Sequence, residues 1–577
     1  MPTPFEDLQS RAAARWEELT AGQSAWIRVG GGTSGLAVGA DRVFDAFNHA
    51  VESSGVNASV SMVGALGLMY MEPQVDVLMP DGTRIYYGNV EPEEAISIVE
   101  QHVKNGEPLL DRAFAYSVSD GAASGETGVG KLPVLESLPM FALQERIATR
   151  NFGEIDPHDL LQYVANDGYT ALNRALTEMT PEQIVDEIKA AGLRGRGGAA
   201  FPAGLKWSFL APSDAPVKYV LCNAEEGDPG AFNDKNILES DPGTLVEGVI
   251  IAGYATGASK GYIFIRHGHN GPIDRCRAAV DQARELGFLG ENIMGSDFSY
   301  EIEIALTGDS YVAGEESALM EAIEGKRAMP RFRPPFPAQV GLFGKPTNIN
   351  NVKTLAYIPE IVSKGGEWFA GIGHDTSTGT VILCLTGPLK YTGMIEVPLG
   401  INLKDVINEA AGGMQEGKTL KFLQTGGPLG GVLGADNIDI LLDFEVLRAA
   451  GAIVGSGGLI AADESACIVD MTRSLISFCQ YESCGKCFPC RMGMSHLLEV
   501  LERICDLEGT TEDLDLMRSI GENMQAGSLC GHGQLGYNPV SSALRYFGSE
   551  FDTHIIDRTC PTGTCLTPRY SPAQSRR

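Results

Sequence analysis

The sequence predicts a multidomain α/β protein that ends in a helical region rich in cysteine. Between residues 138 and 370, short β-rich apolar segments such as 219–222 and 262–265 alternate with helical segments such as 242–253. Further along, helical periodicity surrounds a set of closely spaced cysteines. With 577 residues the chain is long enough for roughly four domains.

Composition and charge are those of a folded globular protein, with 44% hydrophobic and 20% charged residues. No apolar run approaches the roughly 18 residues that a membrane span needs, and the first twenty residues show no apolar core with a cleavage site. We therefore expect a cytoplasmic protein without a membrane span. The formal net charge of −30 argues against nucleic acid as a partner, because an acidic protein surface repels the phosphate backbone.

The chain divides by pattern and composition. The N-terminal part reads strand, helix, strand, strand, and a small polar stretch follows it, as in a linker. A strand-rich piece separates the central α/β region from the helical end. The predicted division is 1–115, linker 116–137, 138–375, 376–445, 446–550 and tail 551–577.

The C-x-x-C-x-x-C run of Cys484, Cys487 and Cys490 is the densest chemical signal. Three thiolates with this spacing can converge on one centre from a single loop, and Cys530 can complete four ligands. Zinc usually takes two pairs of cysteines instead, and twelve cysteines are too sparse for a disulfide framework. The run predicts one [4Fe–4S] cluster.

A glycine-rich stretch, residues 192–207, is the second signal. Glycines let backbone amides approach a phosphate or a flat ring, and Arg196 and Lys206 add positive charge. Phe201 and Trp207 can stack on a base or flavin. Such a loop alone is weak evidence for a nucleotide.

Further motifs give the loop its context: residues 222–232, 311–319, 331–337 and 346–352. Together they closely resemble the NADH-binding flavoprotein subunit of respiratory complex I, a subunit type also used by NAD-linked hydrogenases and formate dehydrogenases. The resemblance covers residues 138–554. It implies a Rossmann-like domain holding FMN beside NAD(H), then a β-grasp module, then a helical bundle with the [4Fe–4S] cluster.

The resemblance also assigns residues. The implied FMN and nucleotide contacts are Gly195, Arg196, Gly197, Gly198, Phe201, Lys206, Phe209, Asn223, Glu225, Asp228, Tyr311, Gly314, Glu315, Glu316, Arg333, Phe336, Asn350, Asn351 and Thr354. Among these, Glu315, Glu316 and Lys206 are the implied catalytic residues. Asp228 stands where relatives often carry glutamate and Arg333 where lysine is common, which leaves NAD or NADP preference open.

The stretch Gly30–Gly35 satisfies G-x-G-x-x-G, which suggests a Rossmann dinucleotide site. The next strand, however, does not end in the acidic residue that would hold a ribose. The segment is more similar to a thioredoxin-like ferredoxin domain whose cluster cysteines are replaced here by Ser34, Ala65 and Met69. These side chains cannot supply thiolates, so we expect a cluster-free domain retained for assembly.

The tail contains Cys560 and Cys565. With His554 and Cys467 they make a Cys₃His set of the kind that holds structural zinc. This set resembles a metal site of electron-bifurcating hydrogenase-type subunits. The alternative is four ordinary residues with two free tail thiols.

The expected function is that of an NAD(H):acceptor oxidoreductase (diaphorase) subunit, passing a hydride to FMN and then single electrons to the cluster. Alternatives are an NADP-preferring diaphorase, a membrane complex I flavoprotein subunit, an iron–sulfur scaffold without flavin chemistry, or a simple Rossmann dehydrogenase. The expected partners are a small [2Fe–2S] thioredoxin-like subunit and a catalytic or iron–sulfur subunit, in a hetero-oligomer that can bifurcate electrons. The terminal acceptor is not encoded in this chain.

Overall fold

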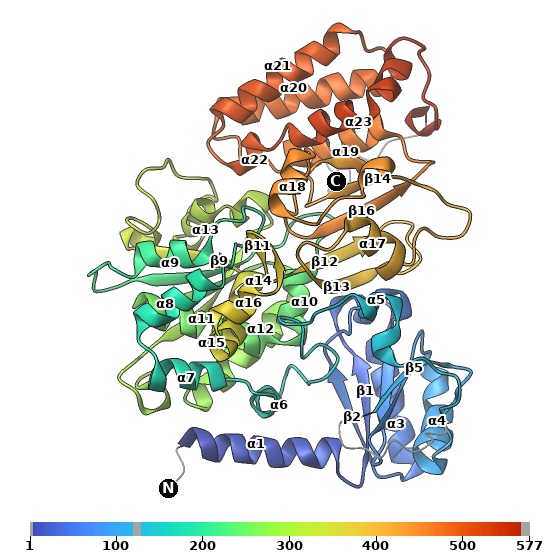
Figure 1. The fold of residues 1–577 in the computed structure, drawn as a ribbon, viewed down its shortest axis with the longest axis vertical. Helices are drawn as coiled ribbons and strands as arrows, with labels where there is room; N and C mark the ends of the chain where they lie inside the picture. Colours follow the sequence, from blue (N-terminus) through green and yellow to red (C-terminus); the bar gives the residue numbers. More distant parts are fainter. Residues whose placement is uncertain (1–3, 119–128, 567–577) are drawn as a thin grey trace.

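Three larger sheets and a helical bundle make up the protein in a computed structural model, which describes residues 4–118 and 129–566. In Figure 1 the N-terminal domain lies at the bottom, the central domain and the β-grasp domain lie above it, and the helical bundle lies at the top. The predicted mixed α/β architecture with a helical end is confirmed.

The N-terminal domain is one mixed sheet of five strands in the order β2-β1-β3-β4-β5. β1 and β2 are parallel and the remaining pairs are antiparallel, as in a thioredoxin-like sheet. Helix α3 begins and ends at left-handed glycines, Gly39 and Gly55. The elements are α1 (Pro4–Thr20), β1 (Ala25–Gly30), α2 (Thr33–Ala37), α3 (Ala40–Ser54), β2 (Ala58–Val63), β3 (Val75–Leu78), β4 (Thr83–Tyr87), α4 (Ala95–Ile98) and β5 (Ala113–Val118).

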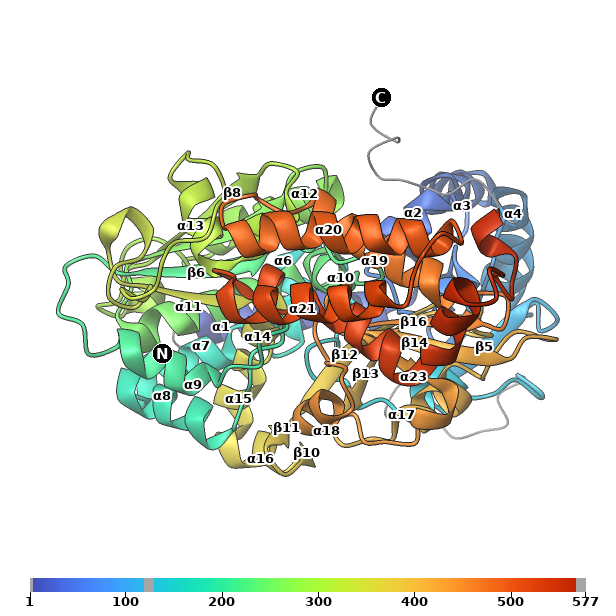
Figure 2. The same ribbon diagram turned by 90° about the horizontal axis from the view of Figure 1, so that it is seen from above.

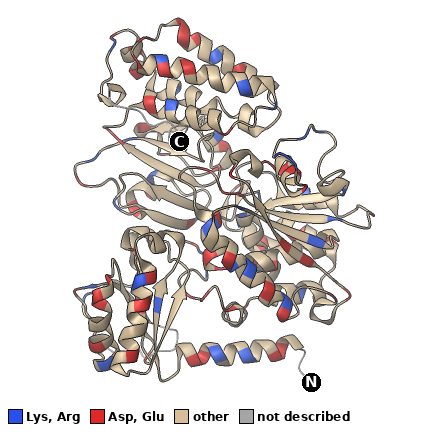
Figure 3. Ribbon diagram, turned by 180° about the vertical axis from the view of Figure 1, so that it is seen from behind, with Lys and Arg blue, Asp and Glu red and all other residues tan. Residues whose placement is uncertain are grey.

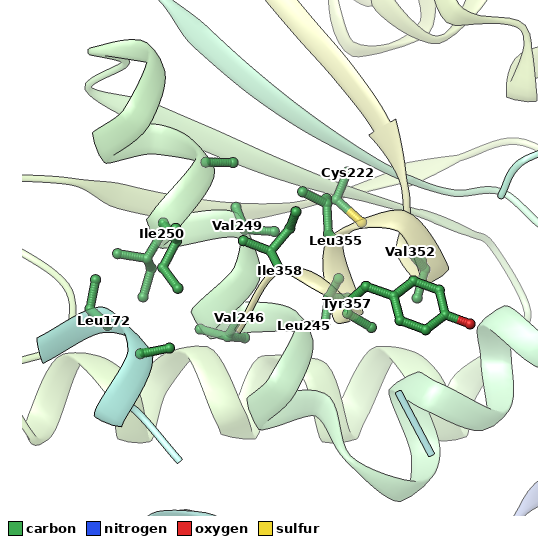
Figure 4. Close-up of a cluster of buried hydrophobic side chains, with 14 of the residues drawn as sticks. Leu172, Cys222, Leu245, Val246, Val249, Ile250, Val352, Leu355, Tyr357 and Ile358 are labelled. Carbon is green, nitrogen blue, oxygen red and sulfur yellow. The ribbon is translucent and has the colours of Figure 1, made fainter. Parts of the chain in front are cut away.

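The central domain holds a fully parallel sheet in the order β8-β7-β6-β9. Helix α11 is apolar almost all round and is buried over nearly its whole length. Figure 4 shows its Leu245, Val246 and Val249 in one cluster with Cys222 and Leu355. The main elements are α7 (Thr170–Glu178), α8 (Pro181–Ala190), α9 (Ala203–Leu210), β6 (Tyr219–Ala224), α10 (Asn233–Ser240), α11 (Pro242–Thr256), β7 (Lys260–Arg266), α12 (Asn270–Glu285), β8 (Glu301–Thr307), α13 (Glu316–Ile323), β9 (Thr347–Asn351), α14 (Val352–Ala356) and α15 (Ile358–Lys364).

The β-grasp domain has five strands in the order β13-β12-β16-β14-β15. The predicted boundary between residues 445 and 446 is wrong, because β16 lies beyond it and is the central strand. β16 pairs parallel to β12 and antiparallel to β14, so the sheet is incomplete without it. The strands are β12 (Thr380–Thr386), β13 (Gly393–Pro398), β14 (Leu420–Thr425), β15 (Val432–Gly434) and β16 (Gly458–Asp463).

The C-terminal domain is a helical bundle, and Figure 2 shows α20 and α21 running side by side across the top of the molecule. Its last long helix, α23, crosses the predicted boundary at residue 550, so this boundary is also wrong and His554 belongs to the bundle. The helices are α19 (Ile468–Tyr481), α20 (Phe488–Cys505), α21 (Glu512–Gly527), α22 (Gly531–Gln534) and α23 (Asn538–Ile555).

Surface charges of both signs are mixed along the helices in the view of Figure 3. Helix α1 carries acidic residues near both ends and two arginines between them. No helix in residues 4–118 and 129–566 combines the length and the apolar character needed to cross a membrane.

Helix α1 and Arg84 mark two of the places where the N-terminal domain is fastened to the central domain. Helix α1 runs beneath the central domain and ends beside the N-terminal sheet (Figure 1), with Phe5 against Phe288 of the central domain and Trp16 against Trp26 of β1. Elsewhere the buried guanidinium of Arg84 joins Asp76 of its own sheet, at 2.8 Å, to Glu154 of the central domain, at 2.7 Å.

We expect Arg84→Met to lower the local free energy of opening of strands β3 and β4 by about 3 kcal/mol, because it removes one of two buried guanidinium groups that pair with Asp76 and Glu154 and leaves both carboxylates to Arg28. Hydrogen exchange of the backbone amides of residues 75–87 in the full chain measures this. Arg112→Met is the control, since Arg112 and Glu94 form an exposed pair for which a change below about 1 kcal/mol is expected. Equal effects of the two substitutions would contradict the prediction.

Candidate functional site

The candidate site lies where β6 and β9 end, side by side and parallel, and we call this region the crevice. Asn223 and Asn351 are register partners at this edge. The chain leaves β6 toward β7 on one side and returns to β9 on the other, and such a reversal opens a crevice at the carboxyl ends of parallel strands. Asn223 donates a hydrogen bond to the carbonyl of Gly314 at 2.7 Å, which ties the loop before α13 to the same edge.

The glycine loop closes one wall of this crevice between α8 and α9. The amide of Gly195 donates to the carbonyl of Phe201 at 2.8 Å, and the amide of Arg196 donates to Thr354 Oγ1 at 2.9 Å. A Cβ atom at Gly197 would lie 2.9 Å from Cβ of Asn351. Glycine is therefore required where the loop meets the strand edge, as expected of a backbone cradle for a phosphate or ring.

Arg196 corrects one expectation. Its side chain is buried and donates to the carbonyls of Arg194 (2.7 Å), Thr378 (2.7 Å) and Thr380 (3.0 Å). The guanidinium thus fastens the glycine loop to the start of the β-grasp domain and does not supply charge to the crevice. Because water does not reach these carbonyls in the interior, they need hydrogen-bond donors from the protein.

Trp207 corrects a second expectation. It is fully buried, and its indole N–H donates to Asn350 Oδ1 at 2.9 Å. It therefore fixes Asn350 and cannot stack on a ligand. Phe201, Phe209 and Phe336, in contrast, are 47%, 55% and 54% exposed, which is unusual for phenylalanine and leaves their faces free for a planar ligand.

A charged cluster lies beside these rings. Lys206 donates to Glu316 at 2.8 Å and Arg333 donates to the same carboxylate at 2.6 Å. Burial raises the pKa of Glu316, but these two cations outweigh burial and hold its pKa below the ordinary value. Glu315 caps α13, accepting hydrogen bonds from the amides of Ser317 and Ala318. The predicted catalytic trio, Lys206, Glu315 and Glu316, is therefore brought together.

Two further predicted residues, Glu225 and Asp228, follow the end of β6. Burial raises the pKa of Glu225 to about 8, although Arg266 donates to it at 2.8 Å. Burial also raises the pKa of Asp228. Sequence reasoning missed Arg266 and likewise Lys353, which donates to Asp234 at 2.6 Å. No motif pointed to either cation, because their partners lie far away in sequence.

The three cysteines of the run and Cys530 lie at the junction of the helical bundle and the central domain. Cys484 lies in the loop after α19, Cys487 precedes α20, Cys490 is in its first turn and Cys530 precedes α22. A Cβ atom at Gly533 of α22 would lie 2.8 Å from Cβ of Cys490 in α20, which shows how closely these two helices pack. An all-cysteine donor set of this kind fits an iron–sulfur cluster.

Without a metal, burial keeps two of these thiols protonated. Burial raises the pKa of Cys490 to about 12 and that of Cys530 to about 11. A metal must therefore displace the protons for the thiolates to form.

Tyr311 joins the crevice to the cysteine loop. Its amide donates to Glu482 at 3.0 Å, two residues before Cys484. Its ring lies 5.3 Å from the ring of Phe478 and 5.6 Å from that of His532. The predicted ligand-contact residue Tyr311 thus packs directly against both cysteine-bearing segments.

The second metal candidate is the set Cys467, His554, Cys560 and Cys565, all buried, with ligand atoms within 4.8 Å of one another. Cys467 Sγ lies 3.6 Å from Cys565 Sγ and 3.4 Å from His554 Nε2. Two sulfurs on a tetrahedral zinc, with bonds of about 2.3 Å, are about 3.8 Å apart, whereas a disulfide needs about 2.05 Å. His554 Nδ1 lies 2.8 Å from the carbonyl of Glu550, so Nε2 is free to ligate.

The N-terminal glycine loop is not open to a dinucleotide. The amide of Thr33 donates to Glu239 of α10 at 2.8 Å, and the amide of Ala65 donates to Ser240 at 3.2 Å. A carboxylate from the central domain therefore occupies the position where a phosphate would bind. Burial raises the pKa of nearby Glu72 to about 7.

Comparisons with known proteins agree with the crevice and the cysteine loop as the two candidate centres. Residues 188–360 match the Nuo51 FMN-binding domain, and residues 470–554 match the NADH-ubiquinone oxidoreductase-F iron-sulfur binding region. The chain is 46% identical to HndC of the NADP-reducing hydrogenase of Solidesulfovibrio fructosivorans, over 75% of this chain and 88% of that protein. It is 42% identical to the F 2 component of the NADH-quinone oxidoreductase of Rhizobium meliloti (strain 1021), over 72% and 99%.

A solved structure also resembles the whole chain. It is that of an NAD⁺-reducing [NiFe]-hydrogenase in the H₂-reduced state, with a TM-score of 0.63 and 25% identity, covering 99% of this chain and 95% of that one. The likeness therefore extends through the N-terminal domain.

We expect Arg196→Lys to lower FMN affinity about tenfold or more although charge is retained. The guanidinium reaches the three carbonyls through three different nitrogens, whereas a lysine carries its donors on one nitrogen and cannot span them, and each unsatisfied carbonyl costs about 1–3 kcal/mol. Quenching of FMN fluorescence on binding to the apoprotein measures the affinity. Arg174→Lys is the control, because Arg174 also donates to two backbone carbonyls but lies on α7. Full affinity in Arg196→Lys would contradict a holding role.

Proposed function

Because the chain belongs to the family of the NADH-binding flavoprotein subunit of complex I and related hydrogenases, we propose that its crevice oxidises NADH beside FMN and its cysteine loop carries the electrons out. The observation that supports this most directly is that Tyr311, a ligand contact implied by the resemblance, packs directly against both cysteine-bearing segments. The resemblance predicted from the motifs is confirmed.

The bound cofactors supply the redox chemistry, since FMN takes two electrons together and releases them singly, and an iron–sulfur cluster accepts one at a time. The residues supply geometry. Gly195, Gly197 and Asn223 line the cradle for FMN. Phe201, Phe209 and Phe336 offer exposed faces to the nucleotide, and Glu315 and Glu316 can accept hydrogen bonds from its ribose hydroxyls. We propose NAD(H) as the substrate. NADP(H) is the alternative, because the cations Arg333 and Lys206 lie beside the exposed phenylalanines and could pair with a 2′-phosphate.

Cys484, Cys487, Cys490 and Cys530 would hold the iron–sulfur cluster, which would supply one-electron transfer. The relatives are named as parts of hydrogenase and quinone oxidoreductase assemblies. We propose that this chain likewise works in a hetero-oligomer, with a small [2Fe–2S] thioredoxin-like subunit and a catalytic or iron–sulfur subunit. Electron bifurcation and a cytoplasmic location remain parts of this proposal.

We also propose that Cys467, His554, Cys560 and Cys565 hold structural zinc. The sulfur–sulfur and sulfur–nitrogen distances, the burial of all four residues and the orientation of His554 support it. Zinc here would join the start of α19, the end of α23 and the tail.

NADH should bleach the flavin absorbance of the purified protein reconstituted with FMN and cluster, and the chain should hold about four iron atoms, as in one cubane cluster. Cys490→Ser should lose the electron paramagnetic resonance signal of the reduced cluster. It should keep the bleaching, because other residues form the crevice. No bleaching in the wild-type protein would contradict the proposed reaction. About six iron atoms would contradict a cluster-free N-terminal domain.

Zinc, measured by plasma mass spectrometry, should be about one atom per chain. The double variant Cys560→Ser/Cys565→Ser should lose it, because two of four ligands are removed. Cys276→Ser, which changes a buried thiol of α12, should keep it. Unchanged zinc in the double variant would rule out this site.

A further inference from the structure

The loop that carries Cys484 and Cys487 is fastened to the central domain on both sides of Cys484. Two residues before it, Glu482 accepts a hydrogen bond from the amide of Tyr311 at 3.0 Å. Two residues after it, the ammonium of Lys486 donates to the carbonyl of Pro330 at 2.6 Å and lies 5.5 Å from the ring centroid of Phe332. Neither Glu482 nor Lys486 is a metal ligand.

The partners of Lys486 belong to the segment 330–337, which we name the nucleotide loop. The same segment carries Arg333, which donates to Glu316 at 2.6 Å, and Phe336, which is 54% exposed. Phe332 is 71% exposed. One short segment therefore contacts the charged cluster of the crevice at one residue and the cysteine loop at another.

We propose that Lys486 is a positioning residue that couples nucleotide binding at the nucleotide loop to the redox state of the cluster held by Cys484, Cys487, Cys490 and Cys530. This inference rests on the proposed function, which places the nucleotide at Phe336 and the cluster at the cysteines. It adds a thermodynamic link between the two sites.

The physical reason is the position of the charge. Lys486 lies in sequence between two cluster ligands, so its ammonium lies within one lysine side-chain length of the loop that would hold the cluster, and a positive charge there favours the more negative, reduced state. A nucleotide that orders the nucleotide loop also fixes Pro330 and Phe332, and so holds the ammonium in place. The nucleotide should therefore bind more tightly to the reduced protein and raise the midpoint potential of the cluster.

Coupling between two binding equilibria is reciprocal, so one factor describes both effects. We expect an affinity ratio of about fivefold between the reduced and oxidised protein, at the low end of ordinary coupling. For a one-electron couple this corresponds to a rise of about 40 mV in midpoint potential, since tenfold is about 59 mV.

The test uses the full chain with FMN and cluster, and ADP-ribose as the probe. ADP-ribose lacks the nicotinamide ring and so cannot exchange a hydride with the flavin. The midpoint potential of the cluster is measured by redox titration with electron paramagnetic resonance, with and without saturating ADP-ribose. Calorimetry of ADP-ribose binding to the oxidised and the reduced protein gives the reciprocal measurement.

Three variants separate the role of Lys486 from charge alone. Lys486→Met should abolish the response to ADP-ribose, and Lys486→Arg should restore it, because arginine can donate to Pro330 and lie over Phe332. Arg491→Met is the matched control: Arg491 follows Cys490 and donates to Gly485 at 3.3 Å within the loop. This variant should lower the potential itself and keep the response.

The outcomes are distinct. A protein that holds its cluster and binds ADP-ribose but shows no shift overturns this inference alone, as does an unchanged shift in Lys486→Met. A protein that lacks the cluster signal or does not bind ADP-ribose overturns the proposed function, and this inference with it. A shift that is lost in Lys486→Met and kept in both Lys486→Arg and Arg491→Met supports it.

Discussion

The parallel pairing of β6 with β9 is the constraint on which the rest of the molecule depends. It places Asn223 and Asn351 at one edge of the sheet, where the reversal of strand order leaves room for a ligand. Gly197 can approach this edge because it has no Cβ, and Arg196 holds the loop there from behind through three carbonyls. The cradle is therefore formed by backbone, and its shape is set before any cofactor binds.

The sequence predicted those parts of the protein in which the signal is local. Short apolar runs predicted strands such as β1 and β6, and cysteine spacing predicted the ligands of the run, because three of them share one loop. Arg196 could not be interpreted correctly from its glycine-rich neighbourhood, since two of its acceptors, Thr378 and Thr380, lie in a different domain. Strand β16 was missed for a similar reason: its place between β12 and β14 depends on pairing across the domain.

The two candidate metal centres lie at opposite ends of one helix, α19. Cys467 precedes its first residue, and the loop with Cys484 follows its last residue. A helix of 14 residues is about 21 Å long. Zinc at Cys467 would therefore stabilise the bundle far from the flavin, whereas the cluster loop is held at the flavin end by Tyr311 and Lys486. The proposed structural and redox roles are thus separated along the same element.

Helix α10 makes a comparable connection between the two glycine loops. At its start, Asp234 accepts hydrogen bonds from Asn351 and Lys353 beside the crevice. Near its end, Glu239 accepts a hydrogen bond from the amide of Thr33 in the N-terminal domain. The eight residues of α10 span only about 12 Å. Because a buried carboxylate and its hydrogen-bond donors are costly to separate, the N-terminal loop is held against the central domain by the element that also shapes the crevice.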